Sequence, residues 1–213
     1  MPIPFIHPST ILIAGPSTCG KTCFLIEALC QNMLEPKPDR VVLVYGEAQR
    51  AYDRLTEKFP FIELIKGPLT GEVYDSFKAS ENNLLILDDQ MLEAANSADL
   101  GRLFVQGSHH KNITVVFLVQ NVFEKGKSMK TTNLNSQYLV IFKNPRDKGQ
   151  SAILARQMFP TKWKGFLAAM EDAHSKPYSY LVVDLRPETP DEIRIRSSML
   201  PTDSDAPTKV YII

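Results

Sequence analysis

One short stretch near the amino end carries residue types that bind phosphate. It fits the pattern G-x-x-x-x-G-K-[ST] at every fixed position, and its residues are Gly15, Pro16, Ser17, Thr18, Cys19, Gly20, Lys21 and Thr22. Glycines let backbone N–H groups close around a polyphosphate, and a helix start adds partial positive charge. The pattern predicts that Lys21 reaches the β- and γ-phosphates of a nucleoside triphosphate and that the Thr22 hydroxyl binds Mg²⁺.

The residues on either side supply the strand and the helix that such a loop requires. Thr10–Ala14 is a short apolar and β-branched run, typical of a buried parallel strand. After the loop, apolar side chains recur at helical spacing, at Phe24, Leu25, Ala28, Leu29 and Met33. This context favours a phosphate-binding loop over a glycine turn that matches the pattern by chance.

A second apolar run, Leu84–Leu87, ends in two carboxylates, Asp88 and Asp89. In phosphate-loop enzymes an acid at the end of such a strand faces Mg²⁺. Asp88 is therefore predicted to hold the metal through its water shell. Asp89 is a candidate general base that polarises the attacking water. The alternative for Asp89 is that it caps the helix predicted after it.

A third apolar run, Ile113–Val119, is followed by Gln120. A polar residue just past this strand can contact both the γ-phosphate and the attacking water, which makes Gln120 a candidate sensor. An amide that is merely hydrogen-bonded at a strand end is the alternative.

Strands alternate with helices along most of the chain, which predicts an α/β fold with a mainly parallel sheet in a three-layer sandwich. The phosphate loop follows the first strand, at the edge where such sheets place ligands. The 213 residues suit one domain over residues 1–200 with a tail over 201–213. Further strands are predicted over residues 40–45, 61–65 and 137–142, and helices over 49–59, 72–79, 92–106, 150–158 and 162–173.

Two more strands, over residues 179–184 and 192–196, are predicted to form a C-terminal β extension. Ile193 and Ile195 alternate with Arg194 and Arg196, which predicts a half-exposed edge strand. The apolar end, Val210–Ile213, is expected to dock on the body or on a neighbouring molecule.

The composition is that of an ordinary globular protein, with 44% hydrophobic and 23% charged residues. Lysine plus arginine (24) equals aspartate plus glutamate (24), so any contact with nucleic acid needs a local patch. Residues 124–148 hold such a basic excess, although a solvated loop is an equal alternative. No membrane span and no secretory signal are expected.

Three cysteines, Cys19, Cys23 and Cys30, cluster at and after the phosphate loop, which argues for a reducing compartment. Cys19 is a candidate oxidisable thiol because a helix N-terminus lowers thiol pKa. A small side chain that fills the loop is the favoured alternative.

The ordered set of phosphate loop, Leu84–Asp89 and Gln120 resembles the FtsK–HerA superfamily of DNA-pumping ATPases. The stretches Gly107–Asn112, Val119–Phe123 and Phe142–Asp147 are similar to those of poxvirus-type genome-packaging ATPases from Polinton (Maverick) elements, adintoviruses and virophages. The resemblance covers about residues 8–200.

The resemblance implies a homo-oligomeric ring that hydrolyses ATP with Mg²⁺ to drive double-stranded DNA into a capsid. The implied partners are DNA and capsid proteins, with no membrane. It implies an intracellular location, in the host nucleus or a cytoplasmic virus factory, with transient presence on the virion. Lys21 and Thr22 carry over as phosphate and metal ligands, Asp88 as the metal acid, Asp89 as the catalytic acid and Gln120 as the sensor.

The superfamily also expects a cation that one subunit donates to its neighbour's site. Arg146 is the first candidate because its turn follows a strand adjacent to the site, and Lys111 and Arg102 come next. Two other functions stay open. One is a small-molecule (nucleotide) kinase, although the arginine-rich lid that such enzymes need is not seen. The other is a non-hydrolysing, nucleotide-dependent factor of capsid assembly.

Overall fold

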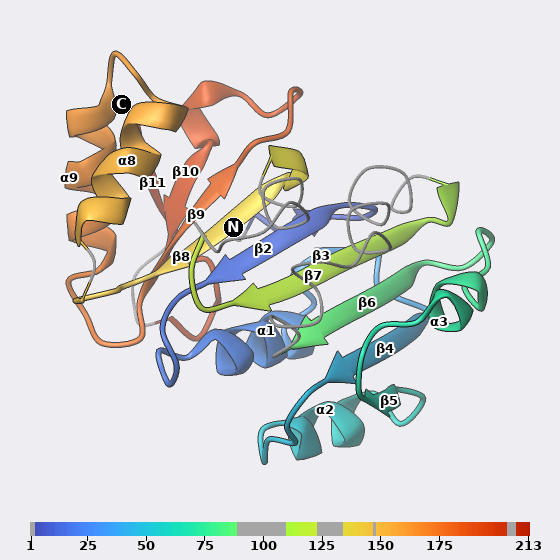
Figure 1. The fold of residues 1–213 in the computed structure, drawn as a ribbon. Helices are drawn as coiled ribbons and strands as arrows, with labels where there is room; N and C mark the ends of the chain where they lie inside the picture. The colour runs from blue at the N-terminus through green and yellow to red at the C-terminus, as the bar shows by residue number, and fades with distance from the viewer. Residues whose placement is uncertain (1–2, 89–109, 123–133, 147, 204–207) are drawn as a thin grey trace.

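The computed structural model describes residues 3–88, 110–122, 134–146, 148–203 and 208–213 (Figure 1). The predicted helix over 92–106, Asp89, Arg102 and residues 124–133 and 147 of the basic stretch lie outside these residues. The strands are β1 Phe5–Ile6, β2 Thr10–Ala14, β3 Leu34–Glu35, β4 Arg40–Tyr45, β5 Glu63–Lys66, β6 Asn83–Asp88, β7 Ile113–Val119, β8 Tyr138–Phe142, β9 Tyr180–Asp184, β10 Ile195–Ser197 and β11 Lys209–Tyr211. The helices are α1 Lys21–Cys30, α2 Tyr52–Lys58, α3 Gly71–Asp75, α8 Lys148–Met158 and α9 Trp163–Ala173.

Within the described residues, nine strands form one sheet in the order β11-β10-β9-β8-β2-β7-β6-β4-β5. Neighbouring strands from β8 to β5 are parallel, and β9, β10 and β11 extend the sheet in antiparallel fashion. The α/β class with a mainly parallel sheet and a C-terminal β extension is thereby confirmed.

Helices cover both faces of this sheet, because its strands are apolar on both sides. In β2, Ile11 and Ile13 belong to one core cluster, together with buried residues of α1 and α2. Leu12 and Ala14 belong to the other, together with buried residues of α9 and Leu154 and Ala155 of α8. Successive side chains of a strand point to opposite faces, so continuous apolar runs mark strands buried on both sides. Figure 1 shows α8 and α9 on the left and α1 and α2 below the sheet.

The register of the parallel strands brings their carboxyl ends together at one edge. Ala14 lies opposite Val119, and Asp88 lies opposite both Leu118 and Tyr45. The residues that follow these strand ends therefore meet at a single place, which is where the candidate site lies.

The C-terminal extension differs from the prediction for residues 192–196. Strand β10 is buried, Arg196 is 0% exposed, and β11 pairs along its outer side. Ile193 lies in a 3₁₀ turn instead of the strand. The prediction of a half-exposed edge strand is therefore wrong, because a strand from the chain end covers β10 and a buried acid neutralises Arg196.

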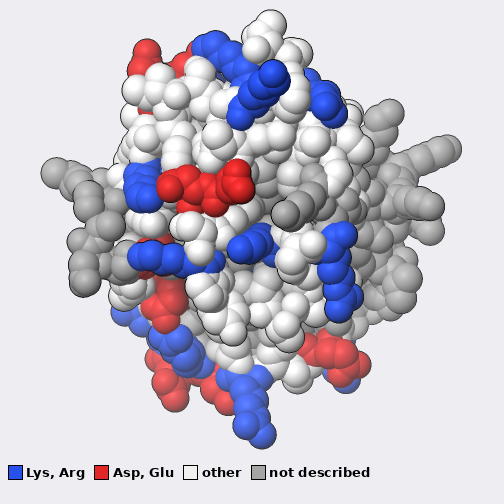
Figure 2. Space-filling view, turned by 90° about the vertical axis from the view of Figure 1, so that its left-hand side faces the viewer, with Lys and Arg blue, Asp and Glu red and all other residues white. Residues whose placement is uncertain are grey.

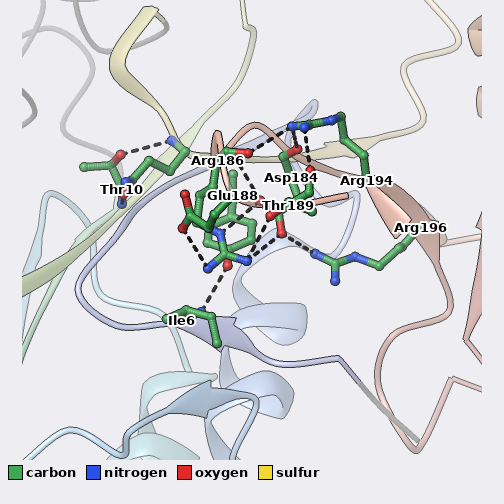
Figure 3. A network of polar contacts seen from close by, with 10 residues as sticks. Ile6, Thr10, Asp184, Arg186, Glu188, Thr189, Arg194 and Arg196 are labelled. Carbon is green, nitrogen blue, oxygen red and sulfur yellow. Dashed lines mark hydrogen bonds and ion pairs between the residues drawn. The ribbon is translucent and has the colours of Figure 1, made fainter. Parts of the chain in front are cut away.

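That buried acid is Asp184, the centre of a polar network (Figure 3). Nη2 of Arg196 and Nη2 of Arg186 donate to its Oδ2 over 3.0 and 2.9 Å. Arg194 donates from Nη1 to the backbone carbonyl of Asp184 over 2.7 Å. The network joins β9 to β10 through charge-assisted bonds, which are stronger than neutral ones.

Residues at the chain end, expected to be a tail, complete the sheet as β11. Tyr211 and Lys209 both donate to Asp172 of α9, over 2.7 and 3.0 Å. Lys162 donates to the backbone oxygen of Ile213 over 2.7 Å. Val210 and its neighbours therefore dock on the body of this chain. Among the helices of the described ranges, none is long and apolar enough to cross a membrane.

Candidate nucleotide-binding site

The stretch Gly15–Thr22 forms a loop between β2 and α1, as predicted. A Cβ placed on Gly15 would lie 2.6 Å from Cβ of Phe142, so only glycine fits there. Gly20 has φ 103°, in the left-handed region that favours glycine, at the N-cap of α1. Both glycines are thus required by the shape of the loop, independently of any ligand.

The Lys21 side chain folds back over the loop. Its Nζ donates to the carbonyl oxygens of Gly15 and Pro16 over 2.7 and 3.1 Å. A lysine held above the loop in this way can exchange these carbonyls for phosphate oxygens. Its predicted role in binding the β- and γ-phosphates stays a prediction.

Cys19 lies inside the loop as a packed side chain. A Cβ on Gly15 would be 2.7 Å from its Sγ, which shows how closely the sulfur fills the interior. Burial raises the pKa of the Cys19 thiol, against the opposing effects of the Lys21 charge and backbone N–H groups. The thiol is therefore protonated at neutral pH, which favours the loop-filling interpretation over an oxidisable site.

Asp88 ends β6 facing the loop, and it is buried. The Thr22 hydroxyl donates to its Oδ2 over 3.2 Å, which joins the two predicted Mg²⁺ ligands directly. Gln49 and Tyr52 donate to the same oxygen, from Nε2 over 3.1 Å and from the hydroxyl over 2.9 Å. These donors fix the carboxylate so that it faces Thr22.

Gln49 and Tyr52 are functional candidates that the motif search missed. Both follow β4, whose last residue, Tyr45, lies opposite Asp88 in the sheet. A systematic search of residues after every parallel strand would have found them, since the carboxyl ends of such strands share one edge.

A cavity of about 770 Å³ opens beside the loop. Lys21, Thr22, Asp88, Gln49 and Gln120 are among the residues that line it, and they meet where β6 and β7 end beside the phosphate loop. The remainder of the wall is formed by Ser17, Thr18, Gly20, Cys23, Phe24, Glu27, Leu118, Val119, Tyr178, Tyr180, Leu200, Thr202 and Asp203. The volume is that of a site for a small ligand.

Mg²⁺ prefers oxygen ligands and commonly takes one or two protein groups together with substrate phosphates. The Thr22 hydroxyl and the Asp88 carboxylate fit that preference, and they already lie within 3.2 Å of each other. The described part of the chain contains no cluster of three or more His, Cys, Asp or Glu side chains that could hold a metal. Thr22 and Asp88 would thus hold the ion together with the phosphates of a bound nucleotide, where it would neutralise developing charge.

Gln120 lies at the carboxyl end of β7, and it lines the cavity next to the phosphate loop. Its position agrees with the predicted sensor role, which stays a prediction. Asp89, the predicted general base, lies outside the described residues, although it directly follows Asp88.

Candidates for the donated cation lie at different edges of the sheet. Arg146 is exposed in the turn after β8, where its N–H donates to Oδ1 of Asn144 over 3.1 Å. It does not line the cavity of its own chain, as a group that acts on a neighbour requires. Lys111 precedes β7, at the opposite edge, and its Nζ donates to the carbonyls of Tyr74 and Asp75. Arg102 lies outside the described residues.

On the molecular face covered by α8 and α9, the described residues form no continuous basic patch. Figure 2 shows lysine and arginine interspersed with acidic and uncharged side chains there. Residues 124–133 and 147 of the predicted basic stretch are outside the described part of the chain.

No protein-family model and no curated protein sequence matches this chain. Solved structures do match its fold. The genome packaging NTPase B204 from Sulfolobus turreted icosahedral virus 2, in complex with AMPPCP, has a TM-score of 0.58 and 9% identity, over 95% of this chain and 96% of that chain. The same protein in complex with ATP-gammaS has a TM-score of 0.57, 9% identity and the same coverage.

B204 from Sulfolobus Turreted Icosahedral Virus, described as a DNA-packaging ATPase, matches with a TM-score of 0.57 and 11% identity, over 95% of this chain and 96% of that chain. At such identities the likeness establishes the fold alone, and function must be argued from the site. The likeness nevertheless extends over nearly the whole of both chains.

Proposed function

We propose that this protein is a Mg²⁺-dependent ATPase that drives double-stranded viral DNA into a capsid. The observation that carries the proposal is the hydrogen bond between Thr22 and Asp88 beside the phosphate loop. It joins the two metal ligands of a phosphate-loop ATPase at one end of a cavity large enough for a nucleotide.

Hydrolysis requires an activated water in addition to bound phosphate. Gln120 lines the same end of the cavity, and Asp89 follows the metal acid in sequence. In this proposal Asp89 is the general base that polarises the attacking water, and Gln120 contacts both that water and the γ-phosphate. This arrangement supports hydrolysis over a non-hydrolysing assembly factor.

The packaging role draws support from two independent sources. The sequence resembles the FtsK–HerA superfamily, and the fold matches B204 structures that were solved with ATP analogues. We place the protein nearest to the Polinton, adintovirus and virophage packaging ATPases, on the three stretches named above. A homo-oligomeric ring, with Arg146 donated to the neighbouring site, is part of this proposal.

The proposed location is intracellular, in a host nucleus or a cytoplasmic virus factory. The free thiols of Cys19, Cys23 and Cys30 are compatible with a reducing compartment. Contact with DNA is expected to be directed at the phosphate backbone, and therefore to weaken as salt rises.

ATP turnover with Mg²⁺ tests the proposal, measured with and without double-stranded DNA at low salt. We expect DNA to raise turnover and Lys21→Ala to abolish it, while Lys66→Ala, at an exposed lysine on β5, serves as the control. A phosphorylated small-molecule product would instead identify a kinase. Binding of ATP with no turnover, in an assembly of confirmed ring mass, would identify an assembly factor.

A further inference from the structure

We infer that the nucleoside of the bound triphosphate lies along α1 and that its base stacks on Tyr178. This inference rests on the proposed function only for the presence of a nucleoside triphosphate at the phosphate loop. The residues that carry it lie outside the phosphate-loop motif.

The direction of the nucleotide follows from the two ends of the cavity. Gln49 donates to Asp88, and Gln120 follows the neighbouring strand end, so these lining residues mark the end where the metal and the γ-phosphate are expected. The nucleoside must therefore extend away from this end, past the start of α1. There the cavity is lined by Gly20, Cys23, Phe24 and Glu27.

These α1 residues lie three and four positions apart, so they share one face of the helix. From Gly20 to Glu27 the helix rises about 10 Å. That length accommodates a nucleoside beyond the phosphates. The face is one wall of a groove, and Cys23 is exposed on it.

A second wall comes from β9 and from the segment after β10, and the Tyr180 ring packs on Phe24 of α1 with ring centroids 4.4 Å apart, so the two walls meet at these rings. The Tyr180 hydroxyl donates to Oδ2 of Asp203 and accepts from the N–H groups of Met199 and Leu200. Leu200 N–H also donates to Oδ2 of Asp203 over 2.9 Å. Gln31, the C-cap of α1, donates to the Thr202 hydroxyl over 2.7 Å, which joins the two walls.

Tyr178 stands where this second wall meets the phosphate loop. Its side chain is 72% exposed, although it is a large aromatic group on the edge of a cavity. A Cβ on Gly20 would lie 3.5 Å from Tyr178 Cδ1, so the ring sits against the loop. Its φ of 59° is a left-handed conformation that a bulky residue rarely adopts.

An exposed ring held in a strained backbone conformation beside a ligand site suggests a role in binding. Aromatic rings stack on every nucleobase, and loss of one such contact costs about 5- to 150-fold in affinity. Tyr178 therefore provides base stacking without strict choice of base, and the Tyr180–Asp203 pair holds the wall behind it.

Calorimetric binding of ATP and of inorganic tripolyphosphate tests this subsite, because tripolyphosphate has no nucleoside. We expect Tyr178→Ala to weaken ATP binding about 5- to 150-fold and to leave tripolyphosphate affinity at the wild-type value. Tyr178→Phe keeps the ring and should retain ATP affinity. Phe61→Ala, at an aromatic side chain that is 51% exposed and does not line the cavity, is the matched control.

Wild-type ATP affinity in Tyr178→Ala would overturn the inference, as would equal losses for both ligands. The proposed function has its own test in Lys21→Ala, which should weaken both ligands because it removes the phosphate contact. A wild-type protein that binds neither ligand would overturn the proposed function and the subsite together. Binding of both ligands with no effect of Tyr178→Ala overturns the subsite alone.

Discussion

At the scale of single residues, the site depends on how Asp88 is held. Its carboxylate is buried, and burial of an unpaired charge is costly. Donors from Thr22, Gln49 and Tyr52 offset that cost and orient Oδ2 toward the phosphate loop. Loss of a group that orients a metal ligand typically costs about 10- to 100-fold in metal affinity or activity.

Tyr52→Phe removes the hydroxyl that donates to Asp88 over 2.9 Å. We expect the Mg²⁺ concentration for half-maximal ATP turnover to rise about 10- to 100-fold. Titration of Mg²⁺ at saturating ATP measures this shift. Tyr45→Phe is the control, because that ring packs 5.4 Å from the Tyr52 ring but its hydroxyl makes no hydrogen bond to Asp88. An unchanged Mg²⁺ requirement in Tyr52→Phe would show that the hydroxyl does not orient the carboxylate.

Alkylation tests the state of the loop cysteine. Because burial raises the pKa of Cys19 above its ordinary value, its reactive thiolate forms only at pH values above the usual thiol range. At pH 7.5 iodoacetamide should therefore modify exposed Cys23 well before Cys19, and peptide mass mapping measures the two rates. The Cys19 rate should rise only as pH passes beyond about 8.5, the ordinary thiol pKa. Faster modification of Cys19 at pH 7.5 would restore the oxidisable-site interpretation.

The sequence alone predicts those site residues that belong to a local sequence pattern. Lys21 and Thr22 belong to one motif, and Asp88 ends a run of aliphatic residues. Tyr52 and Tyr178 could not be found in that way, because their roles depend on contacts with residues far away in the chain. For Tyr52 the missing information was that β4 and β6 are neighbours in the sheet.

At the scale of elements, the C-terminal extension is organised around buried charge. Arg196 and Asp184 are both 0% exposed, and Nε and Nη1 of Arg196 are buried without a hydrogen-bond partner among the described residues. Removal of one partner from a buried pair leaves an uncompensated charge, at a cost of about 3–5 kcal/mol. The extension is therefore sensitive to this one carboxylate.

Asp184→Ala should lower the free energy of unfolding by about 3–5 kcal/mol, since Arg196 would lose its anion. Urea denaturation followed by circular dichroism measures the change. Asp191→Ala removes an acid from the same extension, but its side chain is 91% exposed and pairs with Arg194 at the surface. That control should change stability by less than about 1 kcal/mol. Equal, small losses in both variants would contradict the role given to Asp184.

The apolar runs and the rules of parallel sheets made the central strands and the fold class predictable, whereas the order of the strands comes from the structure. The cover over β10 in the C-terminal extension could not be predicted from the sequence. An alternation of isoleucine and arginine indicates a strand with one solvent-exposed face only if no other segment covers that face. Here β11 and Asp184 provide the cover, and neither is visible in the local pattern of residues 192–196.

At the scale of the whole molecule, stability should depend on pH through two buried histidines. Burial lowers the pKa of His7 and of His174 below the usual 6.5. Below pH 6.5 these histidines therefore bind protons in the unfolded chain while they remain neutral in the folded chain. Stability should be constant above this pH and fall as pH drops through the window between 6.5 and the lower folded values, by at most about 1.4 kcal/mol per pH unit for each histidine.

Urea unfolding at pH 7.5 and pH 5.5 checks this dependence. The wild-type chain should be less stable at pH 5.5, and the double variant His7→Gln/His174→Gln should lose most of the difference. His110→Gln, at an exposed histidine, should keep it. Equal wild-type stability at the two pH values would contradict the account of these histidines.

The central claim is that nucleotide hydrolysis at this site moves the protein along double-stranded DNA. The most direct measurement is displacement of a third strand from a DNA triplex, because a translocating motor strips it without cutting the duplex. We predict displacement that requires ATP and Mg²⁺, fails in Lys21→Ala and declines as salt weakens contact with the phosphate backbone. ATP turnover by an assembly of confirmed ring mass, with the third strand left in place at low salt, would contradict the claim.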